Sequence, residues 1–356
     1  MNFYRLMQLG APEMKNKIRS EQDPKLKRRY RTAFWTKNIL CVLFAVVFIG
    51  LLSAVFGSEN GAAGVAIFCI LLTVQFVDFG YSPKSSLWGL GISFALMTFG
   101  PMLAAAGAPI WGFCINLISI LTILILTSKD PRFGNHGVYV LGYLLILGSP
   151  VPEGGMMRRI LVMAVGFVLC AAVFWHAHHK KTSKMTIPDV VKEFSFSSSV
   201  SCWQVKMALG VSCVMLLGDI FSVPKAMWLG ISCMSVMQIE ASDLKERLSL
   251  RVPFAVLGSA AFGIIFLLCP AEFRPYIGIV SGLCTGFCTR YHWKTLFNCF
   301  GALITPAALY GIGSSILLRI GLNFFGAGFA FVFYHAFDKV VEAMKALPAK
   351  RVSDEI

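Results

Sequence analysis

Apolar runs of about 20 residues recur along this chain from residue 34 to residue 337. A helix of that length spans about 30 Å, the thickness of the hydrocarbon core of a bilayer. Only 14% of the residues are charged, against about 25% in an average soluble protein. A soluble helical protein would need a charged face on each helix, and these runs lack one. The sequence therefore predicts an all-α integral membrane protein.

The apolar runs predict about twelve transmembrane helices, six in each half of the chain. In the first half they cover residues 34–57, 61–78, 85–106, 109–128, 137–149 and 158–179. In the second half they cover residues 201–221, 224–239, 252–269, 274–289, 295–311 and 314–338. Two of these runs, 137–149 and 224–239, are short for a full crossing, so tilted or broken helices are expected there. A chain of ten spans is the alternative, but it would disturb the alternation of basic and less basic loops across the membrane.

The placement of basic residues predicts the orientation. Residues 1–33 hold nine basic and three acidic residues directly before the first apolar run. With this segment in the cytoplasm and twelve alternating spans, 27 of the 32 Lys and Arg lie on the cytoplasmic side. Such asymmetry is typical of an inner or plasma membrane protein with both ends inside. The net charge of +14 then reflects topology and contact with anionic lipids, not nucleic acid.

The chain repeats itself after about 160 residues. Residues 157–179 and 317–338 share an Arg-Ile pair, a glycine seven residues after the arginine, and a final Phe-aromatic-His-Ala. Two halves with six spans each have the same orientation, related by an axis along the membrane normal. We therefore expect two parallel six-helix repeats. The expected segments are a basic N-terminal segment 1–33, repeats 34–179 and 201–340, a cytoplasmic linker 180–200 and a tail 341–356.

Three short motifs occur in both repeats. They are a basic residue before Leu-Gly in the third span (Lys84, Leu90-Gly91; Arg251, Leu257-Gly258), prolines around the third loop (Pro101, Pro109; Pro270, Pro275) and an arginine at the head of the sixth span (Arg159; Arg319). This pattern resembles the fusaric acid resistance (FUSC) and aromatic acid exporter superfamily, with the plant aluminium-activated malate transporters as distant relatives. The chain resembles two such modules fused, almost without soluble domains. The resemblance implies efflux of organic anions, aromatic carboxylates in particular.

Two symmetric pairs of basic residues are candidates for substrate binding. Arg159 and Arg319 occupy equivalent positions near the outer ends of the sixth and twelfth spans. Because arginine stays charged and its fork matches a carboxylate, the pair could attract an anion at the seam between the repeats. The alternative is that each arginine reaches the headgroups and binds no substrate. Lys37 and Lys206 form the second pair, near the inner ends of spans one and seven, with anchoring at the interface as the alternative.

Acidic and histidine side chains are candidates for proton coupling. Asp78 and Glu240 follow spans two and eight, and Asp219 lies near the outer end of span seven. The alternative for these carboxylates is an interfacial ion pair with Lys84 or Arg251. His176 and His335 end the two copies of the repeated stretch. They could relay protons, and the alternative is a place in the aromatic belt at the membrane interface.

The sequence favours transport over catalysis. The chain has no nucleotide-binding loop and no hydrolase or zinc-protease motif, so we expect neither an enzyme nor a cofactor. Its eleven cysteines lie mostly within apolar runs, so no metal site is expected. The leading hypothesis is a secondary transporter that exports small organic anions through a pathway between the repeats. A passive anion channel, an exporter of another class of small molecule and a non-transporting scaffold are the alternatives. An adaptor protein or a homo-oligomer stays open as a further partner.

Overall fold

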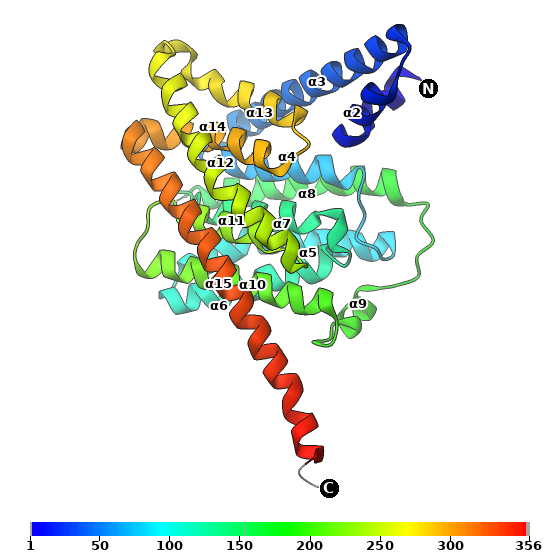
Figure 1. Cartoon of the computed structure of the whole chain (residues 1–356), viewed down its shortest axis with the longest axis vertical. Coiled ribbons are helices and arrows are strands. Elements are labelled where there is room, and N and C mark those ends of the chain that lie inside the picture. Colours follow the sequence, from blue (N-terminus) through cyan, green and yellow to red (C-terminus); the bar gives the residue numbers. More distant parts are fainter. Residues whose placement is uncertain (1, 153, 354–356) are drawn as a thin grey trace. The chain divides into compact units, whose positions relative to one another are not determined.

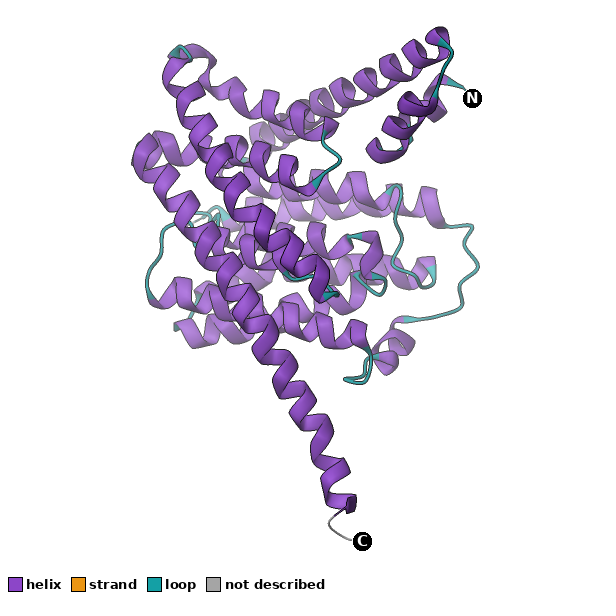
Figure 2. Cartoon of the chain, viewed as in Figure 1, coloured by secondary structure: helices purple, strands orange, loops and turns teal. Residues whose placement is uncertain are grey.

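The computed structural model describes residues 2–152 and 154–353, with side chains placed up to residue 343. The regular structure of these described residues is entirely helical (Figure 2). It comprises fifteen α-helices and three short 3-10 helices within the described ranges. The prediction of an all-α membrane protein is confirmed.

Three helices form the N-terminal part of the chain: α1 (Phe3–Met7), α2 (Ala11–Ser20) and α3 (Pro24–Phe56). Asp23 precedes α3 and accepts a hydrogen bond from the backbone N–H of Lys25 at 2.9 Å, and Pro24 supplies the first helical residue. This is a favourable helix start, because the proline lacks the N–H that would be unsatisfied there. The helix α3 therefore begins ten residues before the first apolar run and carries the basic segment continuously into it.

Each predicted apolar run coincides with one helix. In the first half these helices are α3, α4 (Gly61–Val74), α5 (Pro83–Ala105), α6 (Pro109–Thr127), α7 (Asn135–Leu147) and α8 (Met156–His178). In the second half they are α10 (Ser199–Ile220), α11 (Met227–Val236), α12 (Ala241–Leu268), α13 (Ile277–Phe287), α14 (Tyr291–Tyr310) and α15 (Ile312–Ser353). The linker contains a further short helix, α9 (Ile187–Glu193), whose first turn is closed by a hydrogen bond from the Thr186 backbone N–H to Asp189.

Seven of the described helices are long and apolar enough to cross a membrane. They are α3, α5, α6, α8, α10, α12 and α15. The helices α4, α7 and α11 are apolar but shorter. Large apolar side chains such as Leu43, Leu51 and Val55 are exposed along α3, as expected of a helix that faces lipid. The chain is thus a multi-pass membrane protein.

The chain divides into two compact units. Unit 1 consists of residues 1–50 and 249–323, and unit 2 consists of residues 51–248 and 324–356. In unit 1, α13 packs on α14, and the rings of Phe34 and Trp35 on α3 lie 5.2 and 4.4 Å from the ring of Phe287 on α13. The α12 segment of this unit contacts α14, since the rings of Phe262 and Phe300 lie 6.0 Å apart. The candidate residues Lys37 and Arg319 belong to unit 1.

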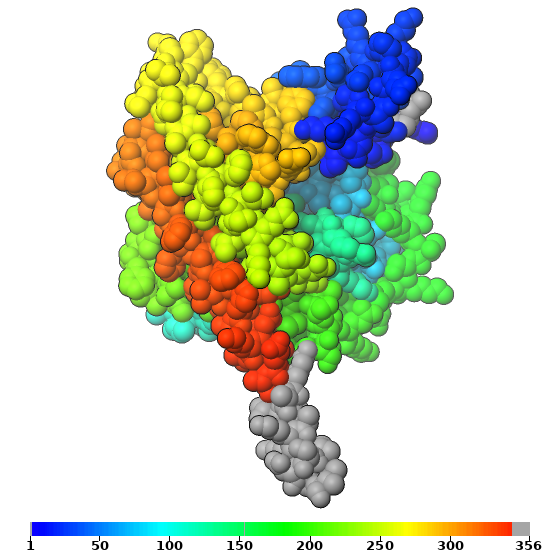
Figure 3. Space-filling model, viewed as in Figure 1, coloured from blue at the N-terminus to red at the C-terminus, as the bar shows by residue number. Residues whose placement is uncertain are grey.

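In unit 2, four helix pairs dominate the packing: α5 with α6, α10 with α6, α4 with α7, and α4 with α8 (Figure 1). Fully buried aromatic residues fill the space between them, among them Tyr139, Tyr143 and Trp228. The α15 segment of this unit, red in Figure 3, leaves one flank on the surface, where Val332 and Val340 are exposed. The candidate residues Arg159 and Lys206 belong to unit 2.

Candidate functional site

Buried basic side chains are the chemical feature that stands out in these apolar helices. Arg159, Lys206, Arg251 and Arg319 are 3 to 6% exposed, on α8, α10, α12 and α15. Among the described side chains, no Asp or Glu is buried to this degree. Because a buried charge is costly, four basic groups without acidic counterparts of equal burial give the interior a bias toward anions.

Arg159 lies one turn into α8 and joins three elements of unit 2. Its Nε donates to Asn60 Oδ1 at 2.5 Å, and one terminal nitrogen donates to the carbonyls of Glu59 and Ser149 at 3.2 and 3.0 Å. Asn60 and Glu59 precede α4, and Ser149 follows α7. The guanidinium thus satisfies carbonyl oxygens where helices begin and end. The neighbouring Arg158 lies on the surface, 3.6 Å from a carboxylate oxygen of Glu59.

Arg319 lies within unit 1, in a cluster that α12, α14 and α15 build together. It is hydrogen-bonded to Cys299 on α14, and Arg251 on α12 is within electrostatic range. Arg251 donates to the hydroxyl of Tyr291 at 3.2 Å, and Asn323 donates to the Arg319 carbonyl at 2.8 Å. We call Arg251, Tyr291, Cys299, Arg319 and Asn323 the basic cluster of unit 1. Two guanidinium groups close together in an apolar bundle are a suitable environment for a carboxylate.

The basic cluster lies deeper in its helices than the repeat suggests. Arg319 is seven residues beyond the first residue of α15, and Arg159 is three beyond that of α8. At 1.5 Å per residue, Arg319 is about 10 Å from the start of its helix. Cys299 is likewise eight residues into α14. Sequence reasoning had considered Arg251 only as an ion-pair partner for a carboxylate; its position in a repeated motif was the signal that it belongs to a site.

Lys206 has a carboxylate partner on a helix far away in sequence. Its Nζ lies 2.5 Å from Asp338 Oδ1 on α15 and 3.4 Å from the centre of the Tyr334 ring. The ammonium group is therefore held by an ion pair and by the face of an aromatic ring. The hydroxyl of Tyr334 donates to the carbonyl of Ile239 at 3.1 Å, which fixes this ring next to the end of α11.

Lys37, which the sequence pattern pairs with Lys206, contacts the N-terminal segment. Its Nζ donates to the carbonyl of Leu9 at 2.6 Å in unit 1. Leu6 and Met14 are buried against Phe34 in the same region. The two lysines at equivalent sequence positions therefore have different partners: a backbone carbonyl for Lys37 and a carboxylate for Lys206.

The candidate carboxylates lie at helix ends, and the partner of Asp78 differs from the expected one. Asp78 follows α4 and is paired with Lys181, whereas Lys84 is exposed. Burial raises the pKa of the Asp78 carboxyl, but hydrogen bonds from Lys181 and the Gly80 N–H outweigh it, so the pKa is lowered. A carboxylate held this way stays ionised, which favours an ion pair over proton transfer.

Asp219 and Glu240 lie on the surface of unit 2. Asp219 is exposed near the end of α10, where a Cβ at Gly112 would be 3.8 Å from its carboxylate. Glu240 is exposed and precedes α12. Arg251 donates to the hydroxyl of Tyr291 within unit 1, and the alternative pairing of a carboxylate with Arg251 stays a prediction.

The two candidate histidines differ in exposure. His176 is exposed on α8, and His335 is partly buried with Nδ1 2.9 Å from the Phe331 carbonyl. The histidine that α8 buries is His178, whose Nε2 lies 2.9 Å from the carbonyl of Val74 at the end of α4. Sequence reasoning singled out His176 because it matches His335 in the repeat. Burial instead follows the face of α8 that packs on α4.

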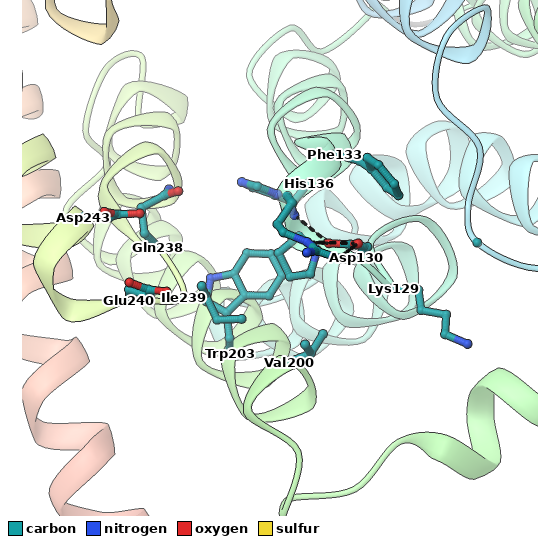
Figure 4. Close-up of a pocket in the computed structure, with 13 residues that line it drawn as sticks. Lys129, Asp130, Phe133, His136, Val200, Trp203, Gln238, Ile239, Glu240 and Asp243 are labelled. Carbon is teal, nitrogen blue, oxygen red and sulfur yellow. Dashed lines mark hydrogen bonds and ion pairs between the residues drawn. The ribbon is translucent and has the colours of Figure 1, made fainter.

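A large cavity opens at the end of unit 2 where α6 and α11 end (Figure 4). It has a volume of about 710 Å³, and Trp203 lies at its centre with His136 packed edge-on at 4.9 Å. Glu240 and Asp243 lie on one side of Trp203, and Lys129 and Asp130 lie on the other. A second cavity of about 280 Å³ shares Trp203 and Ile239 with the first.

Residues 212–333 match the family described as fusaric acid resistance protein-like. The matched range contains Arg251, Cys299 and Arg319, and it excludes Arg159 and Lys206. The chain matches no curated protein and no solved structure. In this multi-pass membrane protein, residues 212–333 are therefore similar to the fusaric acid resistance protein-like family.

Proposed function

We propose that this chain is a secondary transporter that exports small organic anions, with aromatic carboxylates as the preferred cargo, and not an enzyme. The observation that carries this proposal is the burial of four basic side chains in apolar helices, without an acidic side chain of equal burial among the described residues. An anion that passes through such a bundle gains charge-assisted hydrogen bonds, whereas a cation is repelled. The fusaric acid resistance protein-like domain supports the same substrate class.

The basic cluster of unit 1 is the proposed binding station for the cargo. Arg319 and Arg251 come from different helices and lie within electrostatic range of each other. A carboxylate between them would relieve the repulsion of two positive charges, which is strong at low dielectric. Tyr291, which accepts from Arg251, orients that side chain. Arg159 and Lys206 add positive charge within unit 2, and Lys37 adds it within unit 1.

The proposed architecture is twelve spans in two parallel repeats with cytoplasmic ends in the inner or plasma membrane. Two repeated glycines support it. A Cβ at Gly166 on α8 would meet Ile67 on α4, and a Cβ at Gly326 on α15 would meet Leu229 on α11. In both repeats the sixth expected span is thus in close contact with the second. Equivalent contacts at equivalent positions are expected of a structural repeat.

The first span of each repeat supports the same architecture. In unit 2, Gln204 on α10 donates to the carbonyls of Leu124 and Ser128 at the end of α6. In unit 1, Phe34 and Trp35 on α3 pack on Phe287 of α13. Span seven therefore packs on span four, and span one packs on span ten. This reciprocal exchange of first spans is what a pseudo-twofold axis between the repeats produces.

The driving force of the proposed export is the proton gradient or the membrane potential. Asp219 and Glu240 are exposed at helix ends, where they can exchange protons with water, and His335 is partly buried on α15. Asp78 fits the role less well because Lys181 holds its carboxylate in the charged form. His176 is exposed and lies next to Trp175 on α8, so it fits an interfacial position.

The proposal is tested with the full chain in proteoliposomes. Radiolabelled 4-hydroxybenzoate is the anionic probe, its amide is the neutral control, and a polyamine is the cationic control. We expect movement of the acid alone, faster with a proton gradient. Arg319→Gln and Arg251→Gln should each lower kcat/KM by about 10- to 100-fold, which corresponds to the loss of one charge-assisted hydrogen bond. Arg290→Gln, at an exposed position on the same unit, is the matched control.

Four outcomes contradict all or part of the proposal. Currents that reverse with the anion gradient and ignore protons would indicate a passive channel. Movement of the polyamine alone would overturn the substrate class. Failure of correctly folded protein to move any of the probes would indicate a scaffold. Unchanged kinetics in both arginine variants would refute the binding station while leaving transport intact.

A further inference from the structure

A small cavity in unit 2 has a buried cation in its wall. It has a volume of about 280 Å³ and lies where α10 begins and the described side chains of α15 end. Cys202, Trp203 and Lys206 line it from α10. Tyr334, Asp338 and Glu342 line it from α15, and Glu342 is exposed at its edge. The volume is close to the lower end of the range for small-molecule sites. An aromatic wall, a lysine and a row of serines are the groups that a small aromatic carboxylate requires.

The two partners of the ion pair in this cavity differ in their exposure to water. The side chain of Lys206 is 6% exposed, and that of Asp338 is 39% exposed. Lys206 is additionally fixed by the ring of Tyr334, 3.4 Å from its Nζ. Asp338 can turn toward water at little cost, but Lys206 cannot. Because a buried charge without a partner is strongly destabilising, Asp338 leaves only when another anion replaces it.

We infer that this cavity binds the carboxylate of the cargo, and that the cargo replaces Asp338 as the partner of Lys206. The inference rests on the proposed function and names a second site for the same class of ligand. The carboxylate takes the place of the Asp338 oxygens, and the aromatic ring lies against Trp203. The hydroxyls of Ser197 and Ser199, which also line the cavity, are available to the cargo. Asp338 is then an internal competitor that keeps Lys206 neutralised when no cargo is bound.

The first repeat shows why this site belongs to the second repeat alone. The equivalent lysine, Lys37, donates to the carbonyl of Leu9, which is part of the backbone and cannot be displaced by turning a side chain. At the position of Asp338, the first repeat has His179, which lies near the backbone of its own helix with Nδ1 2.9 Å from the Trp175 carbonyl. A carboxylate that can be displaced therefore accompanies Lys206 in the second repeat, whereas the matching position in the first repeat holds a histidine.

Equilibrium dialysis of the detergent-purified full chain against radiolabelled benzoate tests the inference, with benzamide as the neutral competitor. Asp338→Asn should lower the benzoate Kd by about tenfold, because the internal competitor is lost. Lys206→Gln should raise it by about tenfold or more. In the double variant, benzoate should bind as weakly as in Lys206→Gln, since Asp338 acts only through Lys206. Lys184→Gln, exposed in the linker, is the control.

Lys206→Arg is the second variant, in case Lys206→Gln does not elute as a monodisperse species. It keeps the charge, so Asp338→Asn should still lower the benzoate Kd in the Lys206→Arg background. An unchanged Kd in folded Asp338→Asn protein overturns the inference, as do independent, additive effects of the two substitutions. Binding that follows this pattern without any transport in proteoliposomes supports the site and refutes the proposed function. If the protein transports the acid but its benzoate Kd is unchanged in both variants, the site is refuted and the proposed function stands.

Discussion

Arg159 and Asn60, 99 positions apart in the chain, are joined by a hydrogen bond of 2.5 Å from the guanidinium Nε to the amide Oδ1. Asn60 is 1% exposed, and its Nδ2 donates back to the carbonyl of Phe56 at 2.8 Å. The amide thus caps the end of α3 and orients the arginine on α8 at the same time. A guanidinium that donates to three oxygen atoms is held in one orientation by these hydrogen bonds.

Replacing Asn60 with alanine should destabilise unit 2. The substitution leaves the Nε of a buried guanidinium without its acceptor, and a hydrogen bond to a charged group contributes about 1.5–3 kcal/mol. We expect a lower free energy of unfolding and a lower Tm in detergent. Ser58→Ala, at an exposed position two residues earlier, is the control and should leave Tm unchanged. Equal Tm values for both variants would contradict a structural role for this bond.

Two glycines on one helix should differ in their tolerance of alanine. A Cβ at Gly326 would lie 2.6 Å from the backbone oxygen of Leu229, whereas nothing lies within 4 Å of a Cβ at Gly328. Gly326→Ala forces α15 away from α11, and we expect a loss of about 1–3 kcal/mol. Gly328→Ala should be neutral or slightly stabilising, because alanine is the better helix former. Thermal unfolding of the two variants side by side is the measurement.

In the first repeat, Gly166 makes a further comparison possible. A Cβ there would lie 2.6 Å from both the Cδ1 and the Cγ1 of Ile67, which are side-chain atoms and not backbone. Gly166→Ala should therefore cost less than Gly326→Ala, since Ile67 can move and the Leu229 carbonyl cannot. The reverse order of Tm values would show that the contacts of α8 are the less adaptable ones.

The pair of Asp78 and Lys181 should make stability sensitive to acid. The folded-state pKa of Asp78 is lowered below the ordinary value of 3.8. The stabilisation is therefore complete above about pH 4 and is lost as the pH falls through the folded-state pKa. Because the carboxyl is only partly buried, we expect an effect of less than about 1 kcal/mol. Asp78→Asn should remove this acid-dependent part of a pH series of unfolding midpoints, and an unchanged series would refute the pair.

The contact of Lys37 with Leu9 should protect the N-terminal segment from proteolysis. Lys15, Lys17 and Arg19 on α2 are trypsin sites, and the helical backbone around them becomes cleavable when α2 leaves α3 and unfolds. Lys37→Met removes the donor to the Leu9 carbonyl, and we expect several-fold faster tryptic cleavage within residues 15–19. Lys25→Met, at an exposed position at the start of α3, is the control. Equal cleavage rates would show that apolar contacts, such as that of Leu6 with Phe34, are sufficient to hold the N-terminal segment on α3.

The helices and their order follow from local properties of the sequence. Each of the twelve apolar runs became a helix, because run length and the punctuating prolines and glycines act over a few neighbouring residues. The start of α3 at Pro24 was missed, since its first ten residues are basic and carry no apolar signal. The helix α9 was missed for the same reason: its signal is a polar cap at Thr186 and Asp189.

The partners of the charged residues were not accessible from the sequence. The repeated stretches of the sequence singled out Arg159, Arg319, Lys37 and Lys206 as a set of matching positions. It could not indicate that Lys206 contacts Asp338 or that Arg159 contacts Asn60, because these pairs are 132 and 99 positions apart. Equivalent residues ended with different partners, since the segments next to them, such as residues 1–20, are not repeated.

The sequence by itself determined that this chain is a helical membrane protein, where its apolar helices lie, and which basic residues recur in the repeated stretches. These properties depend on apolar run length and on charge placement, which are read directly along the chain. Only the tertiary structure decided that α10 packs on α6 and α3 on α13, that Arg251 lies within range of Arg319, and that Asp338 neutralises Lys206. Those contacts join residues far apart in the chain, and the packing of whole helices, rather than any local preference, brings them together.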